Sequence, residues 1–119
     1  IVSYKGVLSP SEVQKKISEY DVLILPSYRE GYPGVIIEAF SVAVPVIATN
    51  LQGISEIVKN NYSGILVPVK DALKLADSIK SFNNANYSEY SLGAQQAFLN
   101  FDAELQTERI IKLIINESE

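Results

Sequence analysis

The stretch DVLILPSYREGYPGVIIEAFSVAVPVIATN, residues 21–50, decides the fold. Val22 to Leu25 form an apolar run that ends at Pro26, which is typical of a strand buried on both faces of a parallel sheet. A loop follows, then a helix that we expect to begin near Pro33, then a second apolar run, VPVIATN, that predicts another buried strand. A strand, a helix and a strand in this order predict a parallel α/β unit.

The residues before this stretch extend the pattern. IVSYKG, residues 1–6, predicts a short strand at Val2 to Tyr4 that ends at Gly6. A helix should follow, with Ser9 as its N-cap and Pro10 at its first position.

The residues after it add one more strand and several helices. We expect a turn around Gly53 with a short helix from Ser55, and a third buried strand in SGILVPV, residues 63–69. The next helix has Asp71 at its start, and two further helical segments cover about 87–98 and 103–116. The apolar residues expected to be buried are Leu73, Ala76 and Ile79 in the first of these helices and Leu105, Ile110, Leu113 and Ile114 in the last.

The composition limits the chemistry. The chain has 119 residues, 47% of them hydrophobic, which we expect to form a single domain over residues 1–119. It has no cysteine and no histidine, so cysteine nucleophiles, imidazole bases and the usual zinc sites are excluded. The net charge of -4 argues against nucleic acid as a ligand, and no apolar run reaches the roughly 18–20 residues that span a bilayer.

Glu38 is the only charged residue from Gly31 to Asn50. Its helix is apolar almost all round, so the carboxylate lies in a mostly dry setting, and burying it without partners costs several kcal/mol. One interpretation is structural, since a helix start stabilises an anion by roughly 0.3–1 kcal/mol. The other is functional: two neighbouring hydroxyls of a ligand donate to the carboxylate, as ribose does in dinucleotide-binding folds. The helix alone leaves both open.

The loop SYREGYPG, residues 27–34, favours the functional interpretation. It joins a buried strand to a helix, the place where parallel sheets bind ligands, and Gly31 and Gly34 let backbone amides approach one. Glu30 also lies in this loop, where it is either a solvated acid beside Arg29 or a second functional carboxylate. Neither usual phosphate motif, GxGxxG or GxxxxGK[ST], is present.

Together these residues resemble the carboxy-terminal domain of the group 1 glycosyltransferases, also called glycosyltransferase family 4. The specific part is a run P-S-x-x-E-G-x-P-x-x-x-x-E-A with two glutamates eight positions apart. It is matched by Pro26, Ser27, Glu30, Gly31, Pro33, Glu38 and Ala39. The similarity continues through PVIAT at 45–49, Gly53, EIV at 56–58, Gly64 and LVP at 66–68, and so covers nearly the whole chain.

The resemblance implies a Rossmann-like parallel sheet with flanking helices, here an incomplete GT-B carboxy-terminal domain that binds a nucleotide-sugar donor. In the strand order 3-2-1-4-5-6 that the resemblance implies, two strands would be missing between Val2–Tyr4 and Val22–Leu25. We therefore expect the first strand to pair directly with Val22 to Leu25, or two chains to associate across the gap, because an apolar edge should not stay unpaired.

The resemblance also implies transfer with retention of configuration and without a metal or other cofactor. Glu38 would bind the ribose hydroxyls, and Glu30 would act at the reacting centre as the catalytic residue. The loop residues Gly31, Tyr32, Pro33 and Gly34 would contact the donor, and Leu8 and Ser9 would hold the nucleobase.

The chain departs from the family pattern in a few places. Ala43-Val44-Pro45 stands where Gly-x-Pro is usual, Gln52-Gly53 replaces Gly-Gly, and Asn61 replaces a glycine. The Arg and Lys that neutralise the donor diphosphate, and the acceptor-binding amino-terminal domain, would precede Ile1. Without that clamp we expect this chain alone to be inactive. The family implies a cytoplasmic location, with the absent domain as the part that could contact the inner membrane.

Two other classes stay open. The chain could be a non-catalytic nucleotide-sugar-binding module, or one subunit of a split glycosyltransferase. A flavodoxin-like signalling receiver would need a cluster of aspartates at the strand ends, and the first strand carries no such acids.

Overall fold

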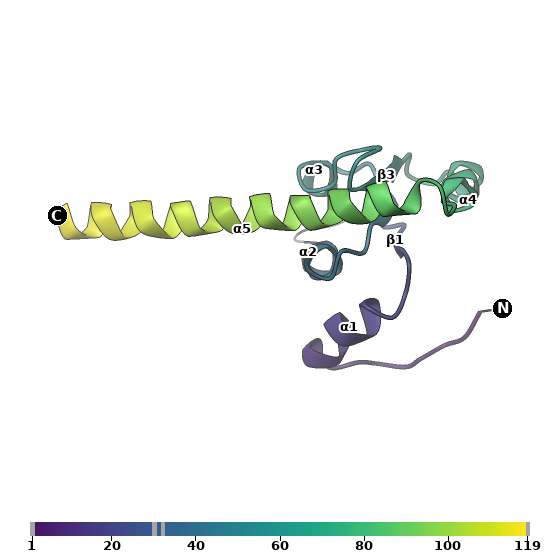
Figure 1. Ribbon diagram of the computed structural model, residues 1–119, viewed down its shortest axis with the longest axis horizontal. Coiled ribbons are helices and arrows are strands. Elements are labelled where there is room, and N and C mark those ends of the chain that lie inside the picture. The colour runs from purple at the N-terminus through teal and green to yellow at the C-terminus, as the bar shows by residue number, and fades with distance from the viewer. Residues whose placement is uncertain (1, 30, 32, 119) are drawn as a thin grey trace.

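The centre of the fold is a three-stranded parallel sheet (Figure 1). The computed structural model describes residues 2–29, 31 and 33–118. The strands, in their spatial order, are β1 (Leu23–Leu25), β2 (Val46–Thr49) and β3 (Gly64–Val67). In the middle of the sheet, Ile47 of β2 pairs with Ile24 and Ile65 on its two neighbours. The predicted α/β class with a parallel sheet is confirmed.

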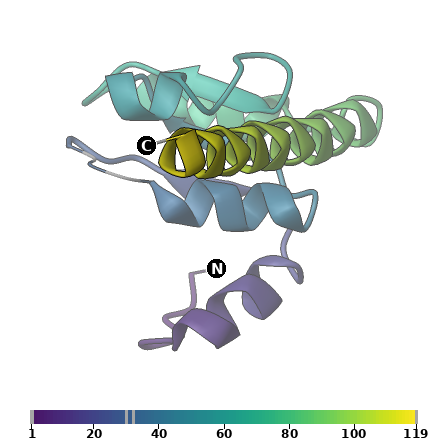
Figure 2. The ribbon, with the colours of Figure 1, turned by 90° about the vertical axis from the view of Figure 1, so that its left-hand side faces the viewer.

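Helices cover both faces of this sheet. They are α1 (Pro10–Ile17), α2 (Gly34–Ser41), α3 (Gln52–Ser55), α4 (Ala72–Ser81) and α5 (Tyr87–Ser118). In Figure 2, α3, α5 and α2 lie in a row across one side of the sheet, and α1 packs on α2 beyond them. The α4 helix lies on the other side, where it contacts β2 and β3 (Figure 1).

The core forms around the middle strand. All four residues of β2 are buried, because β1 and β3 flank the strand and helices cover its two faces. Ile36 and Phe40 of α2 pack into this core, together with Ile54 of α3 and Ala94 of α5. Residues far apart in the sequence thus bury the strand that the apolar run VPVIATN predicted.

The predicted strand at Val2 to Tyr4 is wrong. Residues 2–7 form no strand, and all of them are exposed. The chain passes from this segment into α1, which lies outside α2 and away from the sheet (Figure 2). In this single chain β1 is therefore an edge strand, with Ile24 39% exposed, and the expected direct pairing with Val22 to Leu25 does not occur.

The two predicted C-terminal helices are one continuous helix, α5. No proline or glycine occurs between residues 94 and 118, so nothing in the backbone breaks it. Its last turns project from the body of the molecule (Figure 1), so Ile110, Leu113 and Ile114, predicted to be buried, are 57%, 62% and 61% exposed. Despite these residues, no helix in the part of the chain that the structure describes is long and apolar enough to cross a membrane.

Several local predictions can be compared directly with the structure. Ser9 is the N-cap of α1 and Pro10 its first residue, and Asp71 caps α4 by accepting a hydrogen bond from the Lys74 backbone N–H at 2.9 Å. The short helix α3 begins at Gln52 and ends at Ser55, where the prediction had it begin. Leu73 and Ile79, expected in the buried face of α4, are 81% and 45% exposed.

Two of the departures from the family pattern lie at left-handed backbone positions. Asn61 has φ of 62°, which agrees with asparagine as the next best residue after glycine there. Ala43 has φ of 59°, a conformation that costs a residue with a Cβ roughly 1–2 kcal/mol. The alanine is therefore less neutral than its small size suggested.

Candidate functional site

Glu38 lies inside α2 and has an unsatisfied carboxylate oxygen. The side chain is half-buried, and its Oε2 atom is buried without a hydrogen-bond partner among the residues that the structure describes. Such an atom costs roughly 1–3 kcal/mol when nothing donates to it, and more when it is charged. A ligand that donates hydrogen bonds would remove this cost.

The start of α2 does not account for this acid. Glu38 is the fifth residue of the helix, and the first turn contains no acidic residue. The free N–H groups of a helix belong to its first four residues, and the effect of the macrodipole falls off within the first turn. The structural interpretation of Glu38 is therefore weakened.

Two other buried polar side chains show how this fold satisfies its own groups. The Ser63 hydroxyl accepts a hydrogen bond from the Lys59 backbone N–H at 3.0 Å. The Thr49 hydroxyl donates to the Ser27 carbonyl oxygen at 2.7 Å. Both residues are at most 3% exposed. Oε2 of Glu38 differs from them because no described donor reaches it.

Several predicted site residues lie in the loop before α2. This loop follows the carboxyl end of β1 and leads into the helix that carries Glu38. Pro33 is buried and is the N-cap of α2, and Gly34 is the first residue of the helix. Gly31 is exposed, and a Cβ added there would meet no atom within 4 Å, so there is open space beside its backbone. Glu30 and Tyr32 lie outside the described residues, so the roles given to them remain predictions.

Leu8 and Ser9, the predicted nucleobase contacts, lie at the start of α1. Leu8 is half-buried and Ser9 exposed, and the Ser9 carbonyl oxygen accepts the backbone N–H groups of Glu12 and Val13 at 2.9 and 3.1 Å. In Figure 2, α1 and α2 both begin toward the left of the view. Both predicted parts of the site are thus at the same side of the molecule, but on different helices.

A short chain of hydrogen bonds connects these two helices. Gln14 of α1 donates through Nε2 to the Ser41 hydroxyl at 2.8 Å. The same hydroxyl donates to the backbone carbonyl oxygen of Glu38 at 2.6 Å. This connection links α1 to the helix that carries Glu38, in addition to the packing of Val13 and Ile17 against the core.

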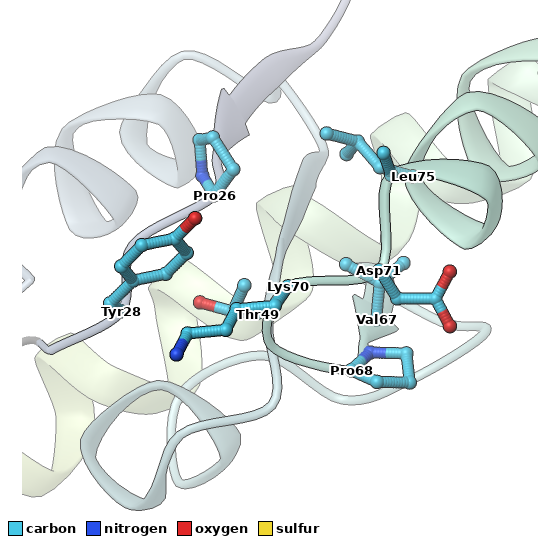
Figure 3. A pocket seen from close by; sticks show the side chains of 9 residues that line it. Pro26, Tyr28, Thr49, Val67, Pro68, Lys70, Asp71 and Leu75 are labelled. Carbon is cyan, nitrogen blue, oxygen red and sulfur yellow. The ribbon is translucent and has the colours of Figure 1, made fainter.

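A cavity of about 520 Å³ lies at the carboxyl ends of the three strands (Figure 3). Pro26 and Tyr28 follow β1, Thr49 ends β2, and Val67 ends β3. Neither Thr49 nor Lys70 was predicted from the sequence to be a site residue. Their signal is positional, since both lie at or just after the end of a predicted strand, where parallel sheets bind ligands.

Comparison with protein families gives one match over most of the chain. A model of the family described as Glycosyl transferases group 1 matches residues 2–97. The capsular polysaccharide biosynthesis glycosyltransferase CapM of Staphylococcus aureus is 34% identical over 91 residues, which are 74% of this chain and 24% of that protein. A Campylobacter jejuni N,N'-diacetylbacillosaminyl-diphospho-undecaprenol alpha-1,3-N-acetylgalactosaminyltransferase is 27% identical over 94% of this chain and 30% of its own length. The chain therefore spans less than a third of either relative.

Solved structures share the fold. Sucrose-phosphate synthase from Thermosynechococcus elongatus aligns over 97% of this chain and 30% of its own with a TM-score of 0.77 and 26% identity. The crystal structure of Anabaena Alr3699/HepE in complex with UDP-glucose aligns over 88% of this chain and 30% of its own, with a TM-score of 0.76 and 22% identity. The second likeness concerns the fold alone.

Proposed function

Because the chain belongs to the group 1 glycosyltransferases, we propose that it is the donor-binding part of an enzyme that transfers a hexosyl unit from a nucleotide sugar to an acceptor, with retention of configuration. The observation that carries the proposal is the buried Oε2 atom of Glu38, which has no described partner. Two neighbouring ribose hydroxyls would supply the missing donors, and a charge-assisted hydrogen bond of this kind contributes about 1.5–3 kcal/mol.

The other roles in this proposal follow the family pattern. Glu30 acts at the reacting centre, the backbone from Gly31 to Gly34 contacts the sugar and phosphates, and Leu8 and Ser9 hold the nucleobase. The proposal requires no metal or other cofactor. It also holds that residues 1–119 bind the donor without transferring it, because the positive charges that neutralise the diphosphate are not among the residues proposed for the site. The names of CapM and of the Campylobacter enzyme support an acceptor in polysaccharide or lipid-linked glycan synthesis.

The test is isothermal titration calorimetry of residues 1–119 with uridine, guanosine and adenosine diphosphates. We expect at least one to bind, and Glu38→Gln to weaken that binding about 10-fold or more, because glutamine replaces an acceptor oxygen with a donor amide. Glu56→Gln is the matched control, since it makes the same charge change at an exposed position. The free energy of unfolding should change little in Glu56→Gln and should not fall in Glu38→Gln, because the amide lacks the charge that makes an unpaired buried oxygen costly.

Three outcomes would contradict this proposal. One is that none of the three nucleotides binds to the unaltered chain. Another is that Glu38→Gln and Glu56→Gln bind the nucleotide equally well. The last is that Glu38→Gln strongly lowers the unfolding free energy while leaving the affinity unchanged, which would restore the structural interpretation. Binding that depends on Glu38, in a full-length protein that transfers no sugar, would favour the non-catalytic module.

We also propose that chains associate through the free edge of β1, because edge strands with exposed apolar residues pair readily. Ile24 of β1 is 39% exposed, so a charged side chain introduced at this position would disturb the proposed association most directly. Sedimentation equilibrium should detect a concentration-dependent dimer, and Ile24→Lys should abolish it. A chain that stays monomeric at millimolar concentration would rule out this association.

A further inference from the structure

The cavity at the carboxyl ends of the strands is a second candidate site, separate from Glu38. The residues that line it include Pro26, Tyr28, Thr49, Lys70 and Leu75, and Glu38 is not among them (Figure 3). Its volume of about 520 Å³ falls within the roughly 300–1,000 Å³ typical of small-molecule sites. Three separate loops converge on it, each of which follows a strand of the parallel sheet.

One side of the cavity carries a cation and an aromatic ring. The Lys70 ammonium lies 5.5 Å from the centroid of the Tyr28 ring, and in Figure 3 its side chain extends under that ring. Within the described part of the chain, no carboxylate lies within ion-pair distance of Lys70. Tyr28 is 65% exposed, so a face of its ring remains accessible to a ligand.

The remaining polar groups are already partly engaged. Asp71 accepts the Lys74 backbone N–H, so the N-terminus of α4 is capped by the protein's own carboxylate and offers little attraction to a further anion. The Thr49 hydroxyl uses its proton on the Ser27 carbonyl oxygen, and its remaining lone pairs can accept from a ligand hydroxyl. Asp71 also lines the cavity, so the positive charge of Lys70 lies beside a carboxylate whose Oδ1 already accepts the Lys74 N–H. The rest of the lining is largely apolar and includes Pro26 and Leu75.

We propose that this cavity binds an anionic pyranose, a sugar ring that carries a phosphate or a carboxylate. The C–H face of the ring packs on Tyr28, a hydroxyl donates to Thr49, and the anionic group pairs with Lys70. This binding does not rest on the proposed function, because it uses residues other than those proposed for the nucleotide.

The backbone at Lys70 offers a variant that separates binding from stability. Lys70 has φ of 61°, which a glycine adopts without strain. Lys70→Gly therefore removes the ammonium group while the midpoint of unfolding stays the same or rises. Lys74→Gln is the matched control, since it removes the same charge from an exposed position one turn along α4 that does not line the cavity.

The experiment follows ¹H–¹⁵N chemical shifts of residues 1–119 during titration with glucose 1-phosphate, glucuronate, methyl glucoside and inorganic phosphate. We expect one or both acidic sugars to shift the amides of Tyr28, Thr49 and Lys70 and to bind at least about 5-fold more tightly than methyl glucoside or inorganic phosphate. Preference for the phosphate or the carboxylate identifies the natural source of the charge. Lys70→Gly should lose this preference, and Lys74→Gln should keep it.

The proposal is overturned if no acidic sugar shifts these amides, if methyl glucoside or inorganic phosphate binds as well, or if Lys70→Gly binds like the unaltered chain. A titration with uridine diphosphate on the same variants distinguishes this failure from that of the donor site. Loss of nucleotide binding in Glu38→Gln alone concerns the donor site, and loss of sugar binding in Lys70→Gly alone concerns the cavity.

Discussion

The middle of the chain and its two ends have similar apolar side chains but very different environments. In the middle, every residue of β2 is buried and Phe40 is 1% exposed. At the ends, Val2 is 100% exposed and Ile111 is 50% exposed. The difference shows that an apolar residue is buried only where another element supplies the opposing surface. The sheet and the helices packed on it supply that surface for the middle of the chain.

The largest change in unfolding free energy should follow from removing a large side chain from the core in the middle of the chain. Phe40→Ala removes one of the largest fully buried side chains, from the face of α2 that packs into the core. The expected loss is about 3–5 kcal/mol of unfolding free energy, because neighbouring side chains fill such a cavity only in part. Urea denaturation followed by circular dichroism measures it. A loss below about 1 kcal/mol would mean that this core is much more loosely packed than the structure has it.

A smaller effect is expected where the middle joins the C-terminal end. Tyr87, the first residue of α5, donates from its hydroxyl to the Asp21 carbonyl oxygen at 2.8 Å. Tyr87→Phe removes this hydrogen bond and should cost about 0.5–1.5 kcal/mol of unfolding free energy at neutral pH. Tyr90→Phe is a control on the same helix.

This contribution should also depend on pH. Burial, and to a lesser extent the charge of Asp21, raise the pKa of Tyr87 above its ordinary value of 10.0. The unfolded chain therefore loses this proton first as the pH rises. The contribution is complete below pH 10 and declines as the pH rises through 10 toward the folded pKa. The stability difference between the unaltered chain and Tyr87→Phe, measured by denaturation at increasing pH, should shrink over that range; a constant difference would contradict the assignment.

The smallest effect should come from the projecting end of α5. Ile114 is 61% exposed, so Ile114→Ser should change the unfolding free energy by less than about 0.5 kcal/mol. Thermal denaturation of the two proteins at low concentration measures the difference. If the loss exceeds 1 kcal/mol, the end of α5 is covered in solution, and the contrast between the middle and the ends no longer holds. The measurement is then repeated at high concentration. A loss that grows with concentration means that another chain packs on the end of α5, and a constant loss means that the same chain does.

Local patterns in the sequence were enough to predict the middle of the molecule. Residues 22–25, 46–48 and 64–67 are continuous runs of apolar residues and glycine, and such runs are buried strands when helices separate them. Two of the wrong predictions, the strand at Val2 to Tyr4 and the burial of Leu113, concern residues whose environment depends on a distant partner. No pattern within a few residues reports whether that partner is present.

The same distinction holds for the candidate sites. Glu38 could be identified from the sequence because a single charge in an apolar helix is a local anomaly. The pairing of Tyr28 with Lys70 could not, because the two residues are far apart in the sequence and only the order of the strands brings them together. Glu30 and Tyr32 lie outside the described residues, so the roles predicted for them remain to be measured.

The two hydrogen bonds that link Gln14 to Ser41 and Ser41 to the backbone of Glu38 have a consequence for the size of the ligand. If Ser9 and Glu38 hold the two ends of a nucleoside, the separation of α1 and α2 sets the length of base plus ribose that fits between them. A larger purine and a smaller pyrimidine would need different separations of the two helices. The hydrogen bonds of Ser41 favour one separation over the other. Ser41→Ala would then reduce the preference for one base over another more than it reduced the affinity for the ribose.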